Sequence, residues 1–180
     1  MLRRLVGSEM CIRDSMLAGD PDTDRFVGGT VYQAFLSAKS YHRWHSPVSG
    51  RIVKAYNVPG TYYSESWLNR TDPAGPNESQ GYITSVAARA LIFIEADNPA
   101  IGLMCFAAVG MAEVSTCQIT VYEGQHVQKG EQLGTFHFGG STHCLIFRPE
   151  TKLQFDFHGQ KPTLNATNIL INAKIASVTC

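Results

Sequence analysis

The chain has 180 residues, of which 44% are hydrophobic and 17% charged, and its 15 basic and 15 acidic side chains give a formal net charge of zero. These proportions are typical of a globular protein that buries one sizeable core. A neutral chain lacks the basic surface that binds nucleic acid, so nucleic acid is excluded as a partner. The longest apolar runs, residues 87–94 and 101–109, are too short for a membrane-spanning helix and are predicted to be buried strands.

The five cysteines, at positions 11, 105, 117, 144 and 180, show neither a CxxC pair nor the spacing of a metal site, so no metal centre is predicted. Their odd number argues against a disulfide framework and favours a reducing compartment. No signal peptide or transmembrane segment is recognised in the chain, which leaves a cytoplasmic or membrane-associated location as the expectation.

The first fifteen residues, MLRRLVGSEMCIRDS, differ from the text that follows them. They are basic, show no cap or turn signals, and resemble the translated adapter sequence found at the ends of assembled sequence fragments. We interpret residues 1–15 as a non-native leader. Native sequence would then begin near Met16, with the natural N-terminal part missing. A natural disordered N-terminus is the alternative.

The first predicted element is a short helix within residues 26–40, where apolar residues have a loose helical spacing. It is expected to lead into YHRWHSP and to stop before Pro47, because a proline disfavours the helical conformation of the residue before it. Residues 49–65, SGRIVKAYNVPGTYYSE, are predicted to be β, with alternation around Ile52, Val53, Ala55 and Val58 and a turn at Pro59-Gly60. Residues 71–81, TDPAGPNESQG, are predicted to be a polar loop.

The rest of the chain predicts a mainly β protein, with a barrel-sandwich-like fold and few short helices. In the text GQHVQKGEQLG, Gly124, Gly130 and Gly134 are spaced as turn residues between short strands. This pattern resembles the hairpin of lipoyl and biotinyl carrier folds. Strands are expected at residues 85–95, 102–109, 113–121, 133–138 and 144–147, on the far side of Arg148-Pro149, and near residues 169–172.

The tripeptide Gly139-Gly140-Ser141 can support self-cleavage. In a pyruvoyl enzyme a serine hydroxyl attacks the carbonyl carbon of the preceding residue, and elimination then breaks the chain. Hydrolysis of the resulting dehydroalanine leaves a pyruvoyl group and ammonia. The reaction needs a backbone that bends sharply before the serine, which glycine supplies, and a base to activate the hydroxyl. Gly-Gly-Ser alone is most often a flexible turn, but here it lies between two predicted strands.

A second motif, YHRWHSPVSG, contains His42 and His45. One helical turn or a tight bend would place both imidazoles on one side. Histidine suits the role of base because its pKa is near neutrality. A solvated histidine pair and a metal site are the alternatives, and a metal site is disfavoured because no third ligand with its own motif accompanies the pair.

The two motifs together resemble those of the phosphatidylserine decarboxylase family. YHRWHSPVSG is similar to the family motif YHRxHxPxDG, and FGGST is similar to the family's cleavage motif, in the same order. The resemblance runs from about Met16 to Ala176. It is strongest to a related branch of fungi and bacteria, some members of which decarboxylate free amino acids such as tryptophan. It implies one catalytic part over residues 16–180, divided into the end of a β-chain (16–140) and an α-chain (141–180).

The resemblance also implies roles for individual residues. Ser141 becomes the covalent pyruvoyl cofactor and Gly140 the new C-terminus. His45 activates the serine for cleavage, and His42 donates a proton to the carbanion during decarboxylation. Supporting positions are Gly139, Thr142 and His143.

The implied reaction is the decarboxylation of phosphatidylserine to phosphatidylethanolamine. The alternative substrate is a free aromatic amino acid such as tryptophan. The substrate amine forms a Schiff base with the pyruvoyl group, which serves as the electron sink. The family commonly forms homodimers, and membrane contact is expected through the missing N-terminal part.

One part of the family's machinery is unmatched. The family uses an upstream aspartate to orient the activating histidine, and the text around Asp20, Asp22 and Asp24 does not match it, so none of the three is assigned. By analogy with a serine triad that has lost its acid, this chain is predicted to cleave itself about 10⁴-fold more slowly or not at all.

Other residues allow further hypotheses. Arg89, inside an apolar strand, either binds a carboxylate or phosphate or forms a structural salt bridge. The remaining histidines, His126, His137 and His158, are interpreted as ordinary turn, strand or surface residues.

A lipoyl or biotinyl carrier is the hypothesis from another functional class, with Lys54 or Lys129 as the modified residue. Neither lysine has the Met, Asp or Ala flanks of such carriers. An inactive fragment is the third hypothesis.

Overall fold

The computed structural model describes residues 15–36, 41–64, 79–111, 116–137, 141–161, 167 and 169–179. Within these ranges the chain is mainly β, as predicted. No helix among them is long and apolar enough to cross a membrane. The elements are η2, a 3₁₀ helix (Thr23–Phe26), β1 (Thr30–Leu36), β2 (Arg43–His45), β3 (Gly50–Val58), α1 (Gln80–Val86), β4 (Arg89–Ala96), β5 (Leu103–Gly110), β6 (Thr116–Ile119), β7 (His126–Val127), β8 (Gln132–His137), β9 (Ser141–Phe147), β10 (Leu153–Phe155) and β11 (Ala176–Val178).

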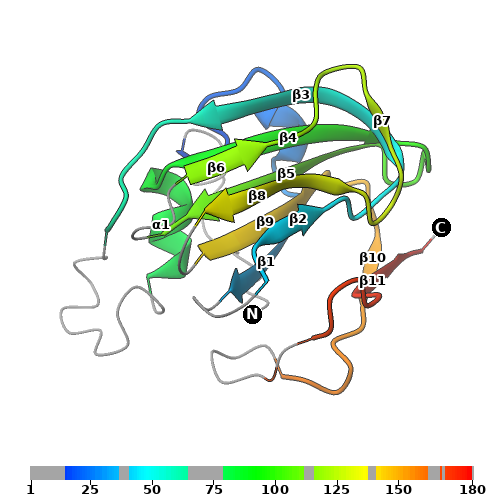
Figure 1. Ribbon diagram of the computed structural model, residues 1–180. Helices are drawn as coiled ribbons and strands as arrows, with labels where there is room; N and C mark the ends of the chain where they lie inside the picture. Colours follow the sequence, from blue (N-terminus) through cyan, green and yellow to red (C-terminus); the bar gives the residue numbers. More distant parts are fainter. Residues whose placement is uncertain are drawn as a thin grey trace.

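Two antiparallel sheets form a β-sandwich (Figure 1). The larger sheet has the strand order β1-β9-β5-β4-β3-β7, and the smaller has the order β2-β8-β6. The predicted sandwich is confirmed, although the sheets described do not close into a barrel. The separate pair β10-β11 lies towards the C-terminal end of the chain.

The six-stranded sheet is buried on both of its faces. One face packs on the smaller sheet, where Phe106 and Leu145 share a core with Trp44 and Phe136. The opposite face packs on the N-terminal segment through the buried residues Met16, Leu17, Phe26, Leu91, Phe93, Cys105, Cys144 and Ile146. Strands buried on both faces are apolar almost throughout their length, which explains the nearly continuous apolar sequences of β4, β5 and β9.

The predicted helix within residues 26–40 is wrong, because residues 30–36 form strand β1. Every residue of β1 pairs with β9, from Thr30 opposite Phe147 to Leu36 opposite Ser141. Apolar side chains lie on both faces of the strand, so their spacing imitated a helix. Tyr32 and Ala34 contact the core between the sheets, whereas Val31 contacts the opposite core.

Three other boundaries also differ from the prediction. Residues 80–86 form helix α1, so the predicted loop ends by Ser79 and the following strand begins at Arg89 instead of residue 85. Residues 71–78 of that loop lie outside the described residues. The last strand is Ala176–Val178, instead of residues 169–172. The position of each short segment depends on packing or pairing with residues that are distant along the chain. The local sequence does not specify these contacts.

The predicted glycine turns are confirmed at two of three positions. Gly124 and Gly130 both have a φ of +87°, which an L side chain rarely adopts. Gly134 instead lies inside strand β8, where a Cβ atom would stand 2.5 Å from the Trp44 ring. Gly134 therefore serves close packing against the tryptophan.

Candidate active site

Ser141 is the first residue of strand β9 and is fully buried. Its hydroxyl is a buried polar atom for which no hydrogen-bond partner exists among the described residues. Its neighbours across the sheet are Leu36 on β1 and Gly110 on β5. Gly139 and Gly140 lie outside the described residues. The candidate nucleophile is thus held in regular strand structure with its hydroxyl unbonded.

Ser141 and His143 share one face of β9, because side chains alternate along a strand. Leu145 and Phe147, further along the same alternation, belong to the core between the sheets, which identifies this face. His143 has Ala34 and Ala108 as its strand neighbours. The two polar side chains therefore face the sandwich interior beside small residues.

The Thr142 side chain points to the opposite face, where it forms hydrogen bonds with the neighbouring strand. Its hydroxyl donates a hydrogen bond to the carbonyl of Ala34 at 3.0 Å and accepts one from the Gln33 amide at 3.2 Å. The Gln33 amide also approaches the main-chain oxygen of Gln80 in α1, at 3.4 Å. Thr142 thus connects β9 to β1 and, through Gln33, to the helix; Gln33 was not singled out in the sequence.

His42 precedes strand β2 and packs against Phe136, with its ring edge-on at a centroid distance of 6.3 Å. Its main-chain oxygen accepts a hydrogen bond from the Phe136 amide. Its Nε2 atom is buried and unpaired within the described part of the chain. Two of the residues predicted to be catalytic, His42 and Ser141, therefore each hold a buried polar atom without a partner.

His45, at the end of β2, is held at both ring nitrogens. Nδ1 lies 2.7 Å from the carbonyl oxygen of Gly130, and Nε2 lies 2.8 Å from the hydroxyl of Tyr41. A carbonyl only accepts, so Nδ1 carries a proton, and in the neutral imidazole Nε2 is then the acceptor for the hydroxyl proton of Tyr41. A main-chain carbonyl thus orients His45 and sets its tautomer, a task that the sequence analysis expected only from an upstream aspartate.

The two histidines do not form the one-sided pair that was predicted. Residues 43–45 are an extended strand with a register shift between Trp44 and His45. His45 lines a large cavity, whereas His42 is absent from the cavity lining and contacts Phe136. The two imidazoles have separate surroundings and are available for separate tasks.

The cavity has a volume of about 1680 Å³ and lies between the interior face of β1 and β9, the β2 region and the C-terminal segment. Its lining includes His45 and His143 but not Ser141. His143 stacks on Phe106 with ring centroids 5.6 Å apart. Burial lowers the pKa of His143 to about 4, so its imidazole is neutral at pH 7.

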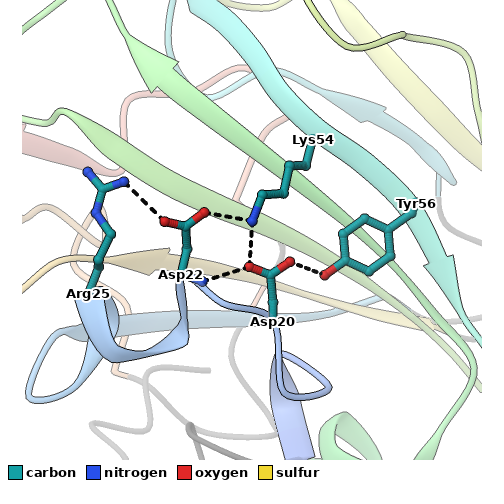
Figure 2. Close-up of polar contacts among 5 residues, drawn as sticks. All are labelled: Asp20, Asp22, Arg25, Lys54 and Tyr56. Carbon is teal, nitrogen blue, oxygen red and sulfur yellow. Dashed lines mark hydrogen bonds and ion pairs between the residues drawn. The ribbon is translucent and has the colours of Figure 1, made fainter.

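A charged cluster missed by the sequence analysis lies on the other face of the sheet (Figure 2). Lys54 donates hydrogen bonds to Asp20 at 2.7 Å and to Asp22 at 2.6 Å, and the Tyr56 hydroxyl donates to Asp20 at 2.6 Å. Arg25 pairs with Asp22 at the exposed edge. One feature of the sequence could have indicated this cluster: Asp20 and Asp22 are two residues apart, and so are Lys54 and Tyr56.

Electrostatics favour the ionised form of this cluster. Burial alone would raise the pKa of Asp20, but the hydrogen bonds from Lys54 and Tyr56 outweigh it and hold the pKa below its usual range. The hydrogen bond from Lys54 likewise lowers the pKa of Asp22. Lys54 is committed to two carboxylates and so does not suit the modified lysine of a carrier.

Arg89 and the remaining histidines have ordinary structural partners. The Arg89 guanidinium is buried and donates to the carbonyl oxygens of Ser15, Met16 and Ala87. It therefore fastens the N-terminal segment to β4, and no acidic side chain in the described part of the chain forms the predicted salt bridge with it. The exposed side chains of His126, His137 and His158 bond to Asp97, Gln118 and the carbonyl of Lys174, respectively.

Within the described ranges, no group of three or more His, Cys, Asp or Glu side chains is placed to hold a metal ion. Cys105, Cys117 and Cys144 are buried free thiols.

Comparison with known proteins gives matches over most of the chain. The family model for phosphatidylserine decarboxylase matches residues 6–169. An L-tryptophan decarboxylase of Psilocybe cyanescens is 46% identical over 171 residues, which cover 91% of this chain and 38% of that protein. Decarboxylase iboD of Amanita muscaria is 50% identical over 158 residues, covering 82% of this chain and 44% of the relative.

More distant relatives carry the family's own name. Phosphatidylserine decarboxylase proenzyme 3 of Schizosaccharomyces pombe is 32% identical over 143 residues, or 79% of this chain and 14% of that protein. The chain therefore spans less than half the length of these curated relatives. By the match of the family model and these identities, the chain belongs to the phosphatidylserine decarboxylase family.

Proposed function

We propose that the protein to which this chain belongs is a pyruvoyl-dependent decarboxylase that makes its cofactor by cleavage between Gly140 and Ser141. The observation that carries the proposal is the buried hydroxyl of Ser141, which has no hydrogen-bond partner among the described residues and belongs to the first residue of a strand that follows two glycines. Native structures seldom leave a buried polar atom without a partner unless it serves a function.

Self-cleavage would use atoms of this chain and one water. The Ser141 Oγ attacks the carbonyl carbon of Gly140 and displaces the Ser141 nitrogen, which converts the amide to an ester. Loss of the Ser141 α-proton then expels the Gly140 carboxylate and leaves dehydroalanine at position 141. Its imine tautomer takes up water and releases ammonia, so one peptide bond becomes a carboxylate and an α-keto acyl group.

The surroundings of Ser141 suit this small group. Gly110 beside it on β5 has no side chain, and the next pair of positions on the same face, Ala34 and Ala108, have methyl groups only. When present, a pyruvoyl group supplies an electron sink for the decarboxylation of an amine-bearing substrate.

The two histidines have different protonation tasks in this proposal. His45 Nε2 is the unprotonated nitrogen of a fixed tautomer, which suits a base for the serine hydroxyl. Tyr41 would give up its hydrogen bond to His45 Nε2 when that nitrogen takes the serine proton. His42, whose buried Nε2 has no partner in the described part of the chain, is proposed as the donor of a proton to the substrate's α-carbon.

Two substrate classes have support among the relatives. The names phosphatidylserine decarboxylase and L-tryptophan decarboxylase both occur among proteins similar to this chain. Decarboxylation of phosphatidylserine to phosphatidylethanolamine is one candidate reaction. Decarboxylation of a free aromatic amino acid is the other, and the aromatic side chains of the cavity lining favour it, while the lining also holds Arg43, Lys129, Lys161 and Lys174. A homodimer, contact with a membrane, and chain ends at residues 16 and 141 stay predictions.

The test is mass spectrometry of the protein expressed from its full open reading frame. We expect two chains, the second beginning with a pyruvoyl group at position 141 that reacts with phenylhydrazine. Ser141→Ala should give a single chain, and Ser177→Ala, which changes an exposed serine of β11, should cleave normally. A single intact chain in the wild type, or a lipoyl or biotinyl adduct on a lysine, would overturn the proposal.

A further inference from the structure

Five rings line one wall of the cavity in continuous contact. Phe106 stacks on His143 with an interplanar angle of 10°, and His143 contacts Tyr32 at a centroid distance of 6.1 Å. Tyr32 stacks on Phe155 at 6.1 Å, and Phe155 stacks on Phe157 at 5.4 Å. All five residues belong to the cavity lining. We call this set the ring wall.

The ring wall runs from the deep interior to the cavity mouth. Phe106 and Tyr32 are 4% and 7% exposed, whereas Phe155 and Phe157 are half-buried. The inner end adjoins the candidate nucleophile, because His143 and Ser141 lie on the same face of β9, two residues or about 7 Å apart. One amino acid has about this length, and Ser141 itself lies behind the cavity lining.

The wall contains two polar groups that no described residue satisfies. The Tyr32 hydroxyl and the His143 imidazole line the cavity without a hydrogen bond to any part of the chain that the structure describes. A neutral imidazole offers one nitrogen that accepts a hydrogen bond. The wall can therefore stack an aromatic ring and also accept a hydrogen bond from it.

We infer that the ring wall is the side-chain subsite for a free amino acid whose aromatic ring carries an N–H or O–H donor, with His143 as the acceptor that selects that donor. The inference rests on the proposed function for the role of Ser141, and it adds the substrate class and His143 as a specificity-determining residue. Planar rings prefer stacked or edge-on neighbours, which this wall provides at each position. Arg43, Lys129, Lys161 and Lys174 also belong to the cavity lining, outside the ring wall, so a phosphate-bearing headgroup is the competing ligand that the test must include.

Equilibrium binding to the full-length Ser141→Ala protein tests the inference without any cleavage or turnover. The probes are L-tryptophan, 1-methyl-L-tryptophan, L-leucine and glycerophosphoserine, measured by calorimetry at pH 7. We expect tryptophan to bind about tenfold more tightly than leucine or glycerophosphoserine, which corresponds to stacking plus one hydrogen bond. The N-methyl analogue should bind several-fold more weakly than tryptophan, because it has no indole N–H to donate.

Two variants locate the effect. His143→Phe keeps the ring and removes the acceptor, so tryptophan should fall to the affinity of its N-methyl analogue while the analogue is unchanged. Phe157→Leu, at the half-buried outer end, should weaken both indole ligands several-fold and leave leucine unaffected, which protects the test if the buried variant folds poorly. Tyr122→Leu changes an aromatic side chain that is 69% exposed and outside the cavity, and it should change none of the affinities.

Several results would overturn the inference. They are equal affinity for leucine and tryptophan, tighter binding of glycerophosphoserine, no binding of either indole compound up to its solubility limit, or an equal loss for all probes in the ring-wall variants. Binding as expected in a protein whose wild type never cleaves would leave the subsite standing and remove the proposed reaction. Cleavage without selective binding would do the reverse.

Discussion

Two polar regions lie on opposite faces of the six-stranded sheet and differ in how their hydrogen bonds are satisfied. On the N-terminal side, Lys54, Asp20, Asp22 and Tyr56 bond to one another at distances of 2.6–2.7 Å (Figure 2). On the interior side, Ser141 and His42 each keep a buried atom without a partner among the described residues.

The difference fits a structural role for the charged cluster and the chemical role that we propose for Ser141 and His42. A buried polar atom without a partner costs about 1–3 kcal/mol, so each one calls for an explanation. The described residues contain four more such atoms, in Thr23, Gln33, Trp44 and Arg148. In the charged cluster, hydrogen bonds among the four side chains offset the cost of burying the charges. The same bonds fasten the N-terminal turn to β3. The serine and the histidine retain free hydrogen-bonding capacity, which a reacting group can use.

The largest expected effect concerns His45. In the full-length protein, His45→Asn removes the base while keeping a polar side chain of similar size, and cleavage should slow by about 10²–10⁴-fold. The rate is followed on denaturing gels after synthesis. His126→Asn, at an exposed histidine that pairs with Asp97, is the matched control and should cleave at the normal rate. An unchanged rate in His45→Asn would remove this residue from the proposal.

Breaking the charged cluster should affect stability instead of cleavage. Lys54→Met leaves Asp20, whose side chain is only 5% exposed, without its cation. We expect a loss of about 2–3 kcal/mol in the free energy of unfolding, at the low end for a buried pair because Lys54 itself is partly exposed. Arg25→Met, at the exposed edge, should cost less than about 0.5 kcal/mol. Urea unfolding measures both, and equal costs would contradict the comparison.

Acid should weaken the same cluster. The pKa values of Asp20 and Asp22 are lowered in the folded chain. The stability that they contribute is therefore complete above the unfolded value of about 4 and is lost as the pH falls through the lower folded values. The difference in unfolding free energy between wild type and Lys54→Met should shrink as the pH falls from 5 to 3. A difference that stays constant over this range would show that ionisation of the carboxylates is not its source.

The smallest effect is expected from removing the unbonded hydroxyl. Ser141→Ala deletes a polar atom that has no partner in the described chain, so the free energy of unfolding should stay within about 1 kcal/mol of an uncleaved reference. Suitable references are His45→Asn proteins that have not cleaved. Thr142→Val on the neighbouring residue removes two hydrogen bonds and should cost more. A larger loss in Ser141→Ala than in Thr142→Val would show that the serine hydroxyl has a structural partner.

Most of the chemistry that could be predicted without a structure came from short sequence motifs. The family was identified from a serine that follows two glycines and from two histidines in the motif YHRWHSPVSG. These residues can be found from the local sequence alone. The β character of β3, β5 and β9 was equally readable, because β-branched and apolar residues in short runs indicate strands wherever they pair.

Partners and faces depended on the tertiary structure. Whether residues 30–36 were helix or strand was decided by pairing with β9, more than a hundred residues later. The carbonyl of Gly130 that orients His45, the four-residue charged cluster and the ring wall all join segments that are distant along the chain. Hydrogen bonds and ring contacts between such segments depend on strand order and register, and these are set by the burial of whole sheets, which no local pattern encodes.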